Sequence, residues 1–305
     1  MYSPFADDEA QGPIETVDVD VASWVEAARN DPVRYRDRQV TEIVLAAIGL
    51  SPSLRDTLVL KGGALMALAF KSERVTGDVD FTAQAEPEGF AEALAEEFNA
   101  ILPKAAVKLG YLDLICRVQT IMKMPRPQNF ADHDFPALRV RIASAARGGR
   151  EEQRLAEGAA SRIVDVEISF RDQVHAFQNL NLTDAEVTVH AFTIHEIVAE
   201  KLRALLQQPI RDRYRRQDVY DIAFLLETRK LDLGEDRRII HKTLIEKCRT
   251  RGITPTSRSF DDPEIARRAK ADWETLSLEL GDLPEFEDRF ALVRAFYISL
   301  PWDDR

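Results

Sequence analysis

The segment from Leu58 to Ala83, LVLKGGALMALAFKSERVTGDVDFTA, constrains the fold more than any other part of the chain. A short apolar run ends at Gly62 and Gly63, and a second apolar run, typical of a buried helix, follows them. Asp78 and Asp80 then stand between apolar neighbours in a strand-like run. Because residues i and i+2 of a strand share a face, the two carboxylates are expected side by side. Burying two like charges without cations is costly, so the pair predicts a divalent-cation site.

A second strand offers the further carboxylate that such chemistry requires. The run RIVDVEISF alternates apolar residues cleanly, and the alternation places Asp165 and Glu167 together on the opposite face. Either side chain can orient or deprotonate an attacking hydroxyl if this strand neighbours the Asp78 strand. The alternative interpretation is the polar outer face of a two-sided sheet.

The remaining patterns predict a mixed-sheet α/β core followed by a mainly helical C-terminal lobe, a bilobal protein. Residues 1–15 are predicted to be a disordered tail, 16–190 the core domain with N-terminal helices, and 191–305 the helical domain. The Gly- and Arg-rich segment 147–158 is predicted to be a loop or hairpin tip. Helices are predicted at 194–207, 216–228, 235–250, 262–280 and 286–298.

Composition narrows the class of protein. The 305 residues are 45% hydrophobic and 30% charged, which is usual for a globular protein. No apolar run approaches the roughly 20 residues of a membrane helix, and the polar N-terminus is unlike a secretory signal. The two cysteines show no metal-binding spacing. These features predict a cytoplasmic protein with no membrane contact.

The net charge of −11 is unevenly distributed. The stretch KLRALLQQPIRDRYRR, from Lys201 to Arg216, contains six basic residues and one acid, and a second basic stretch runs from Arg139 to Arg154. Both predict local contact with a phosphate-bearing partner, such as nucleic acid. Solvated helix faces and a flexible loop are the alternative interpretation.

Lys201 stands on the apolar stripe of a helix that begins with the capping box TIHE at Thr193. Such a lysine either extends its ammonium group to water or meets a buried anion, and a bound triphosphate would serve. Asp218 and Asp221 open the next helix. One of them can cap that helix, while the other, with Asp218 favoured, can bind Lys201, a metal-bound water or the nucleotide.

These motifs resemble those of the AbiEii/AbiGii nucleotidyltransferase toxins, a branch of the polymerase-β-like nucleotidyltransferase superfamily. The first motif, Lys-Gly-Gly, a short helix and Arg-x-Ser/Thr-x-Asp-hydrophobic-Asp-Phe, is matched at Lys61, Gly62, Gly63, Arg74, Thr76, Asp78, Asp80 and Phe81, with Gly77 where an acid is common. The second acidic strand, the Glu-Lys helix and the Arg-x-x-Asp-x-x-Asp helix follow in order at Glu167, Glu200, Lys201, Arg215, Asp218 and Asp221.

The resemblance implies a Mg²⁺- or Mn²⁺-dependent transfer of a nucleotide from a nucleoside triphosphate to tRNA or a protein. It also implies a toxin of a toxin–antitoxin system, active in phage defence, with a winged-helix antitoxin encoded nearby. In this interpretation Asp78 and Asp80 bind metal, and Glu167 or Asp165 activates the acceptor with Lys201 and Asp218. The nucleotide-binding set is Lys61, Gly62, Gly63, Arg74, Thr76, Lys201 and Asp221.

Two other functions compete with this interpretation. The first is a catalytically inert nucleotide-binding protein of the same fold that acts by binding a partner. The second is a small-molecule nucleotidyltransferase of the antibiotic-modifying kind. A polycationic antibiotic requires an acidic pocket, so the basic stretch from Lys201 to Arg216 favours a nucleic-acid acceptor.

Overall fold

The computed structural model describes residues 14–125, 128–229, 231 and 234–303. Nearly all of the predicted disordered tail, 1–15, therefore lies outside the described residues. The chain forms two compact units, which we call the sheet unit and the helical unit. Of the described residues, the sheet unit comprises 14–69, 76–172 and 177–191, and the helical unit comprises 70–75, 173–176 and 192–303.

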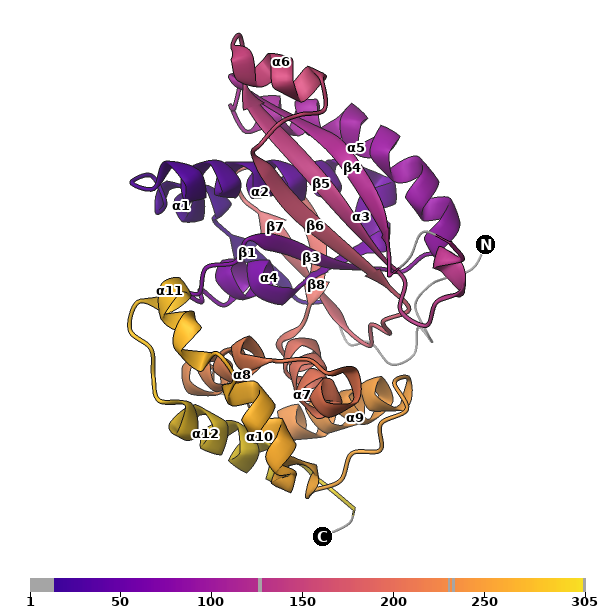
Figure 1. Cartoon of the computed structure of the whole chain (residues 1–305), viewed down its shortest axis with the longest axis vertical. Helices are drawn as coiled ribbons and strands as arrows, with labels where there is room; N and C mark the ends of the chain where they lie inside the picture. Colours follow the sequence, from indigo (N-terminus) through magenta and orange to yellow (C-terminus); the bar gives the residue numbers. More distant parts are fainter. Residues whose placement is uncertain (1–13, 126–127, 230, 232–233, 304–305) are drawn as a thin grey trace. The chain divides into compact units, whose positions relative to one another are not determined.

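The sheet unit is built on one mixed eight-stranded sheet with the order β1-β7-β8-β2-β3-β6-β5-β4 (Figure 1). Its centre pairs β3 parallel with β6, while β2–β3, β5–β6 and β4–β5 are antiparallel. The strands are β1 Thr16–Val19, β2 Leu58–Lys61, β3 Asp78–Ala83, β4 Leu114–Met124, β5 Ala137–Ala146, β6 Ile163–Phe170, β7 Phe177–Leu182 and β8 Val187–Phe192.

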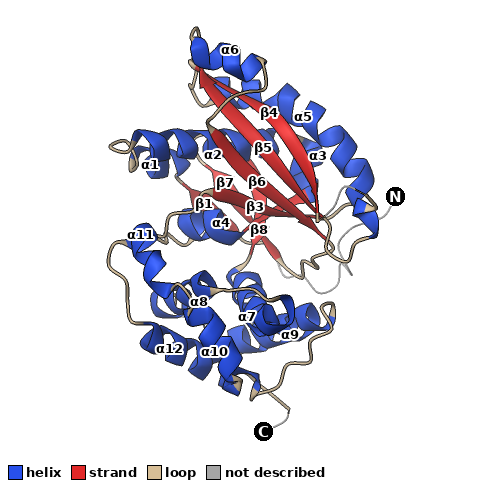
Figure 2. Ribbon diagram, in the orientation of Figure 1, coloured by secondary structure: helices blue, strands red, loops and turns tan. Residues whose placement is uncertain are grey.

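Helices of the sheet unit pack against the sheet and against each other. Helix α5 lies along β4 and contacts α2, which in turn reaches β6 (Figure 2). Asp31 starts α2 by accepting the N–H groups of Val33 and Arg34. The helices are α1 Val21–Glu26, α2 Pro32–Leu50, α3 Pro52–Thr57, α4 Gly62–Ala69, α5 Pro87–Lys108 and α6 Arg150–Ala156, with a 3-10 turn at Phe130–Asp132.

Alternating polarity determines how the central strands face. In β6, the side chains of Val164, Val166 and Ile168 are buried, and those between them are partly exposed. The same period in β5 buries alternate residues and leaves Arg139 and Arg141 partly exposed. The prediction that Asp165 and Glu167 share the opposite face of this strand is therefore confirmed.

The helical unit contains no strand apart from the last residue of β8, within the residues that the structure describes. Thr193 caps α7 by accepting the N–H of Glu196. The helices are α7 Ile194–Arg211, α8 Arg216–Thr228, α9 Glu235–Arg249, α10 Pro263–Lys270, α11 Ser277–Leu280 and α12 Phe286–Ile298, with 3-10 turns at Ser259–Asp261 and Trp273–Leu276. A mixed sheet followed by a mainly helical part confirms the predicted fold class.

Two local predictions are wrong. Residues 147–158 contain α6, because Gly149 and Gly158 flank that helix instead of interrupting it. The helix predicted at 262–280 is broken after α10, where Asp272 takes a left-handed backbone conformation (φ 57°). Strands β1, β7 and β8 have no counterpart in the sequence predictions. No helix among the described residues has both the length and the apolar character needed to span a bilayer.

Candidate active site

Four carboxylates lie on one face of the central strands, and we call this set the acidic face: Asp78, Asp80, Asp165 and Glu167. The parallel register of β3 and β6 sets Asp78 opposite Asp165 and Asp80 opposite Glu167. Register partners point to the same side of a sheet, so the four side chains form two adjacent rows. All four are at least partly exposed. The sequence-predicted carboxylates are thus brought together.

Two arginines of β5 flank the acidic face, and sequence reasoning did not assign them to the site. Arg139 stands opposite Glu167 and Arg141 opposite Asp165. Arg139 donates two hydrogen bonds to Glu167 Oε1, from Nε at 3.0 Å and Nη2 at 2.7 Å. These hydrogen bonds raise the pKa of Arg139. The alternation of ALRVRIASAA places both arginines on one side of their strand, whereas the pairing of β5 with β6 places that side on the acidic face.

The two candidate bases differ in their surroundings. Glu167 Oε1 is held by Arg139, whereas Asp165 Oδ1 is 3.8 Å from Arg141 Nε. That oxygen of Asp165 is inaccessible to solvent and accepts no hydrogen bond from the residues that the structure describes. An unsatisfied buried acceptor costs free energy and requires an explanation. Asp165 Oδ1 therefore retains the capacity to accept a hydrogen bond.

Thr76 and Lys61, both predicted to bind nucleotide, donate hydrogen bonds to polar side chains of the sheet unit. Thr76 Oγ1 donates to Asp78 Oδ1 at 3.0 Å and so orients that carboxylate. Lys61 stands opposite Asp80 in β2, and its Nζ donates to Ser169 Oγ at 2.7 Å and to Asp172 Oδ2 at 2.8 Å. The nucleotide-binding roles of both residues stay predictions.

Gly62 is fitted against the carboxylate of Asp80. It takes a left-handed backbone conformation (φ +68°) and is the first residue of α4. A Cβ atom at this position would lie 2.0 Å from Asp80 Oδ2. Only glycine satisfies both requirements, so the close approach of backbone to carboxylate is built into the fold. Gly63, the second residue of α4, is buried.

We expect Gly62→Ala to displace the Asp80 carboxylate and to lower nucleotidyl transfer by about 10²-fold, because misplacement of a reacting group by about 1 Å has that effect. The strained backbone should lower the free energy of unfolding by about 1–3 kcal/mol. Gly89→Ala is the matched control, since a Cβ there meets nothing within 4 Å. Equal activity of the two variants in a steady-state transfer assay would contradict the assignment.

The acidic face fits one mode of metal binding. Within the described parts of the chain, no group of three or more His, Cys, Asp or Glu side chains is arranged to hold a metal ion. Mg²⁺, however, is usually held by one or two carboxylates together with substrate phosphates. Asp78 and Asp80, neighbours on one face, match that smaller donor set, and Gly62 starts a helix beside Asp80.

The helical unit holds its own charged network around Lys201. From α7, Lys201 Nζ contacts Asp218 Oδ1 at 2.7 Å and Asp221 Oδ2 at 2.8 Å, both on α8. Lys201 is 8% exposed. Burial lowers its pKa, but the two carboxylates more than offset this effect, and the pKa is raised. The two aspartates supply the anions that a buried lysine requires, and its predicted contact with a triphosphate stays a prediction.

Arg74 completes this network from the segment 70–75. Its Nε and Nη2 bind the two oxygens of Asp221 at 3.1 and 3.2 Å, and its Nη1 binds Glu279 Oε2 at 3.0 Å. Asp221 is fully buried, which raises its pKa, but Lys201 and Arg74 lower that pKa by more. Glu279 was not expected from the sequence. The predicted nucleotide contacts of Arg74 and Asp221 also stay predictions.

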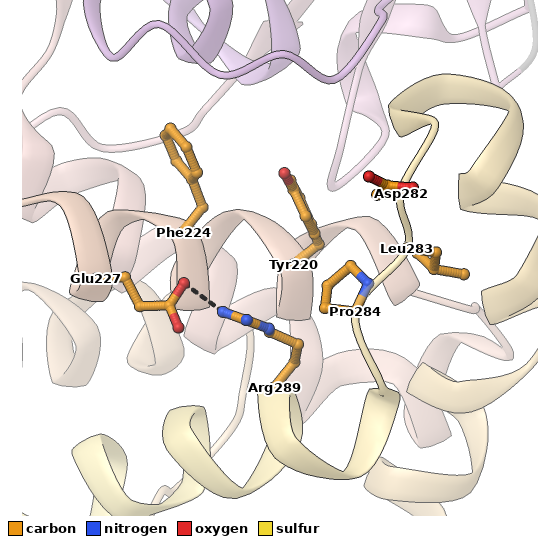
Figure 3. Close-up of a pocket in the computed structure, with 7 residues that line it drawn as sticks. All are labelled: Tyr220, Phe224, Glu227, Asp282, Leu283, Pro284 and Arg289. Carbon is orange, nitrogen blue, oxygen red and sulfur yellow. Dashed lines mark ion pairs between the residues drawn. The ribbon is translucent and has the colours of Figure 1, made fainter.

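A separate pocket of about 340 Å³ lies in the helical unit (Figure 3). The rings of Tyr220 and Phe224, both on α8, stack against each other. Glu227 of the same helix forms an ion pair with Arg289 of α12. The lining is completed by Asp282, Leu283 and Pro284. None of the predicted site residues lines this pocket, because Asp218 and Asp221 lie on the stripe of α8 that contacts Lys201.

Comparisons with known proteins bear on the chain as a whole. The sequence profile described as "Nucleotidyl transferase AbiEii toxin, Type IV TA system" matches residues 44–292. A comparison with curated proteins finds no match. Among solved structures, MenT4, a nucleotidyltransferase toxin from Mycobacterium tuberculosis, is similar with a TM-score of 0.54 at 15% identity, covering 92% of this chain and 89% of that one. JHP933 from Helicobacter pylori aligns with a TM-score of 0.48 at 14% identity over 88% and 90%.

The similarity to MenT4 shows a common fold. The profile match spans most of the chain and includes both the acidic face and the Lys201 network. The chain therefore belongs to the AbiEii family of nucleotidyltransferase toxins, enzymes that use a nucleoside triphosphate and are paired with an antitoxin in type IV toxin–antitoxin systems.

Proposed function

We propose that this protein is a Mg²⁺-dependent nucleotidyltransferase that transfers a nucleotide to RNA, with tRNA the favoured acceptor. Asp78 and Asp80 would hold the metal, which when bound stabilises the negative charge of the transferring phosphate. Gly62 and Gly63 would present backbone N–H groups to the triphosphate at the start of α4. Lys201 is proposed to assist in phosphate binding.

One observation carries the proposal. The register of β3 and β6 gathers Asp78, Asp80, Asp165 and Glu167 in two adjacent rows, with Gly62 directly against Asp80. Such a cluster of carboxylates is costly in a fold unless cations offset it. The two arginines of β5 pair with the β6 acids, Arg139 with Glu167 and Arg141 with Asp165. These pairs, with Gly62 set against Asp80 of β3, support β3 as the metal strand and β6 as the acceptor strand.

Between the two acids of β6, we favour Asp165 as the residue that activates the acceptor hydroxyl. Glu167 Oε1 already accepts two hydrogen bonds from the Arg139 guanidinium, so it is engaged by another side chain. Asp165 Oδ1 accepts none within the described residues and stands opposite Asp78. Glu167, held by Arg139, would then help to position the neighbouring carboxylates of the acidic face.

The proposal is tested by incubating the protein with each α-labelled nucleoside triphosphate, Mg²⁺ and total cellular RNA, and then separating RNA from protein. Label in RNA supports the proposed function. Label in protein alone would redirect the acceptor assignment. Absence of any label, with nucleotide still bound, would favour the inert nucleotide-binding alternative. Pull-down with a winged-helix protein encoded beside the toxin tests the proposed antitoxin type.

The choice of base makes a separate prediction. We expect Asp165→Asn to lower the rate of transfer by about 10²–10⁴-fold, the usual effect of removing a general base. Glu167→Gln should cost less and should be mimicked by Arg139→Gln, because both remove the same ion pair. Rates measured across pH discriminate the two roles. If Glu167→Gln loses more activity than Asp165→Asn and flattens the pH profile, the assignment is reversed.

A further inference from the structure

The segment that joins α7 to α8 concentrates positive charge. We call residues 211–216, with the sequence RDRYRR, the basic loop; it begins at the last residue of α7 and ends at the first of α8. It contains four arginines and one aspartate, a formal charge of +3 in a chain of net charge −11. Such a local excess in an acidic protein marks a candidate surface for an anionic partner.

Exposure separates the basic loop from the rest of the basic stretch. Lys201 and Arg203 are buried and are paired with Asp218 and Glu200 respectively. Residues 211–215 are all exposed, and the Tyr214 side chain is 51% exposed. Of the six basic residues between 201 and 216, the accessible ones therefore lie on the loop.

The single acid of the basic loop, Asp212, pairs with an arginine outside the loop. Asp212 Oδ1 binds Arg268 Nη1 of α10 at 2.6 Å. Burial, and then the nearby guanidinium groups of Arg213, Arg203 and Arg215, lower the pKa of Arg211. Positively charged groups are thus close together around Arg211.

Helix energetics do not explain these residues. Arg215 is the N-cap of α8 and Arg216 its first residue, where the positive end of the helix dipole disfavours cations. No side chain caps this helix end, although Ser, Thr, Asp or Asn would stabilise it. The nearest acid, Asp218, is bound to Lys201 and lies 3.9 Å from Arg215. A local choice that opposes folding stability is expected at functional positions.

We propose that the basic loop binds the phosphate backbone of the RNA acceptor and that Tyr214 stacks on one of its bases. This inference rests on the proposed function, since it names the surface that receives the acceptor. Guanidinium groups recognise phosphates through paired hydrogen bonds, and one tyrosine between arginines suits a base next to phosphates of a single strand. Arg268 lies 5.8 Å from the Tyr214 ring centroid and helps to hold the ring in place.

The test measures RNA binding without nucleotide, so that it does not depend on catalysis. Binding of a labelled RNA hairpin with a single-stranded 3′ end is followed by fluorescence anisotropy between about 50 and 200 mM salt. For the triple variant R211Q/R213Q/R215Q, the loss of three phosphate contacts should make the slope of log K against log salt less negative by about 2. Near 0.1 M salt this corresponds to about 100-fold weaker binding. Tyr214→Ala should weaken binding by about 5-fold or more without changing the slope.

The triple variant R238Q/R249Q/R294Q is the matched control, because it removes the same charge from exposed, ion-paired arginines of the same unit. This control should bind RNA as the wild type does. The proposal fails if the loop variant keeps the wild-type slope, or if the control loses as much affinity. Tighter binding of polyglutamate than of RNA by the wild type would also overturn it, by indicating an acidic protein as the partner. RNA binding without transfer would contradict only the proposed function.

Discussion

Asp80→Asn is expected to lower nucleotidyl transfer by about 10³-fold or more while leaving the fold intact. Asparagine has nearly the same shape as aspartate, so the contact with Gly62 is retained, but the charge that would hold Mg²⁺ is lost. Loss of a metal that stabilises transition-state charge costs several kcal/mol, and each 1.4 kcal/mol is about tenfold in rate. The measurement is initial-rate transfer from an α-labelled triphosphate, with growth arrest on expression as the cellular readout.

Asp134→Asn provides the control, because this exposed aspartate belongs to another pair of the form Asp-x-Asp, Asp132 and Asp134, which is not part of the acidic face. It should retain full activity. A thermal-shift series adds an independent readout: Mg²⁺ with nucleotide should raise the melting temperature of the wild type but not of Asp80→Asn. If Asp80→Asn transferred nucleotide at the wild-type rate, the assignment of the metal site to β3 would be wrong.

Asp221→Asn is expected to lower the free energy of unfolding by about 3–5 kcal/mol, the usual cost of removing one partner from a buried ion pair. The variant leaves two buried cations, Lys201 and Arg74, which keep their ion pairs with Asp218 and Glu279 respectively. Urea unfolding followed by circular dichroism and by the fluorescence of the buried Trp273 and Trp302 measures the change. Glu235→Gln, which breaks an exposed pair with Arg238, should cost less than about 1 kcal/mol.

The same network predicts how this difference depends on pH. The pKa of Asp221 lies below its ordinary value of 3.8, so its contribution is present above about pH 4 and is lost as pH falls through the lowered pKa. The pKa of Lys201 lies above 10.5, so its contribution is lost only as pH rises through that raised value. The stability gap between wild type and Asp221→Asn should therefore stay constant from about pH 5 to 9 and shrink in acid. A gap that varied across neutral pH would contradict this network.

Features with a short sequence period were predictable. The alternation of β6 placed Asp165 and Glu167 on one face, and Thr193 marked the start of α7. Both follow from backbone geometry repeated within a few residues, so no distant contact was needed. The glycine pair Gly62 and Gly63, which precedes Asp78 and Asp80, was likewise recognisable from a short local pattern.

Features that depend on distant pairing were not predictable. Arg139 enters the acidic face only because β5 pairs with β6 in one register, and a shift of one residue would turn it to the other side. Glu279 reaches Arg74 across 205 positions of sequence. Strands β7 and β8 lie between β1 and β2 in the sheet, and their place there is set by pairing with strands that are distant in sequence.

Because the two units are interleaved along the chain, neither can be produced by itself as a single continuous fragment. The segments 70–75 and 173–176 belong to the helical unit although both interrupt the sheet unit in sequence. A fragment beginning at residue 192 would lack Arg74 and keep Asp221 with one cation fewer. Truncation at a single site therefore cannot isolate the complete helical unit. Recombination between relatives must exchange all of its sequence segments together to preserve it.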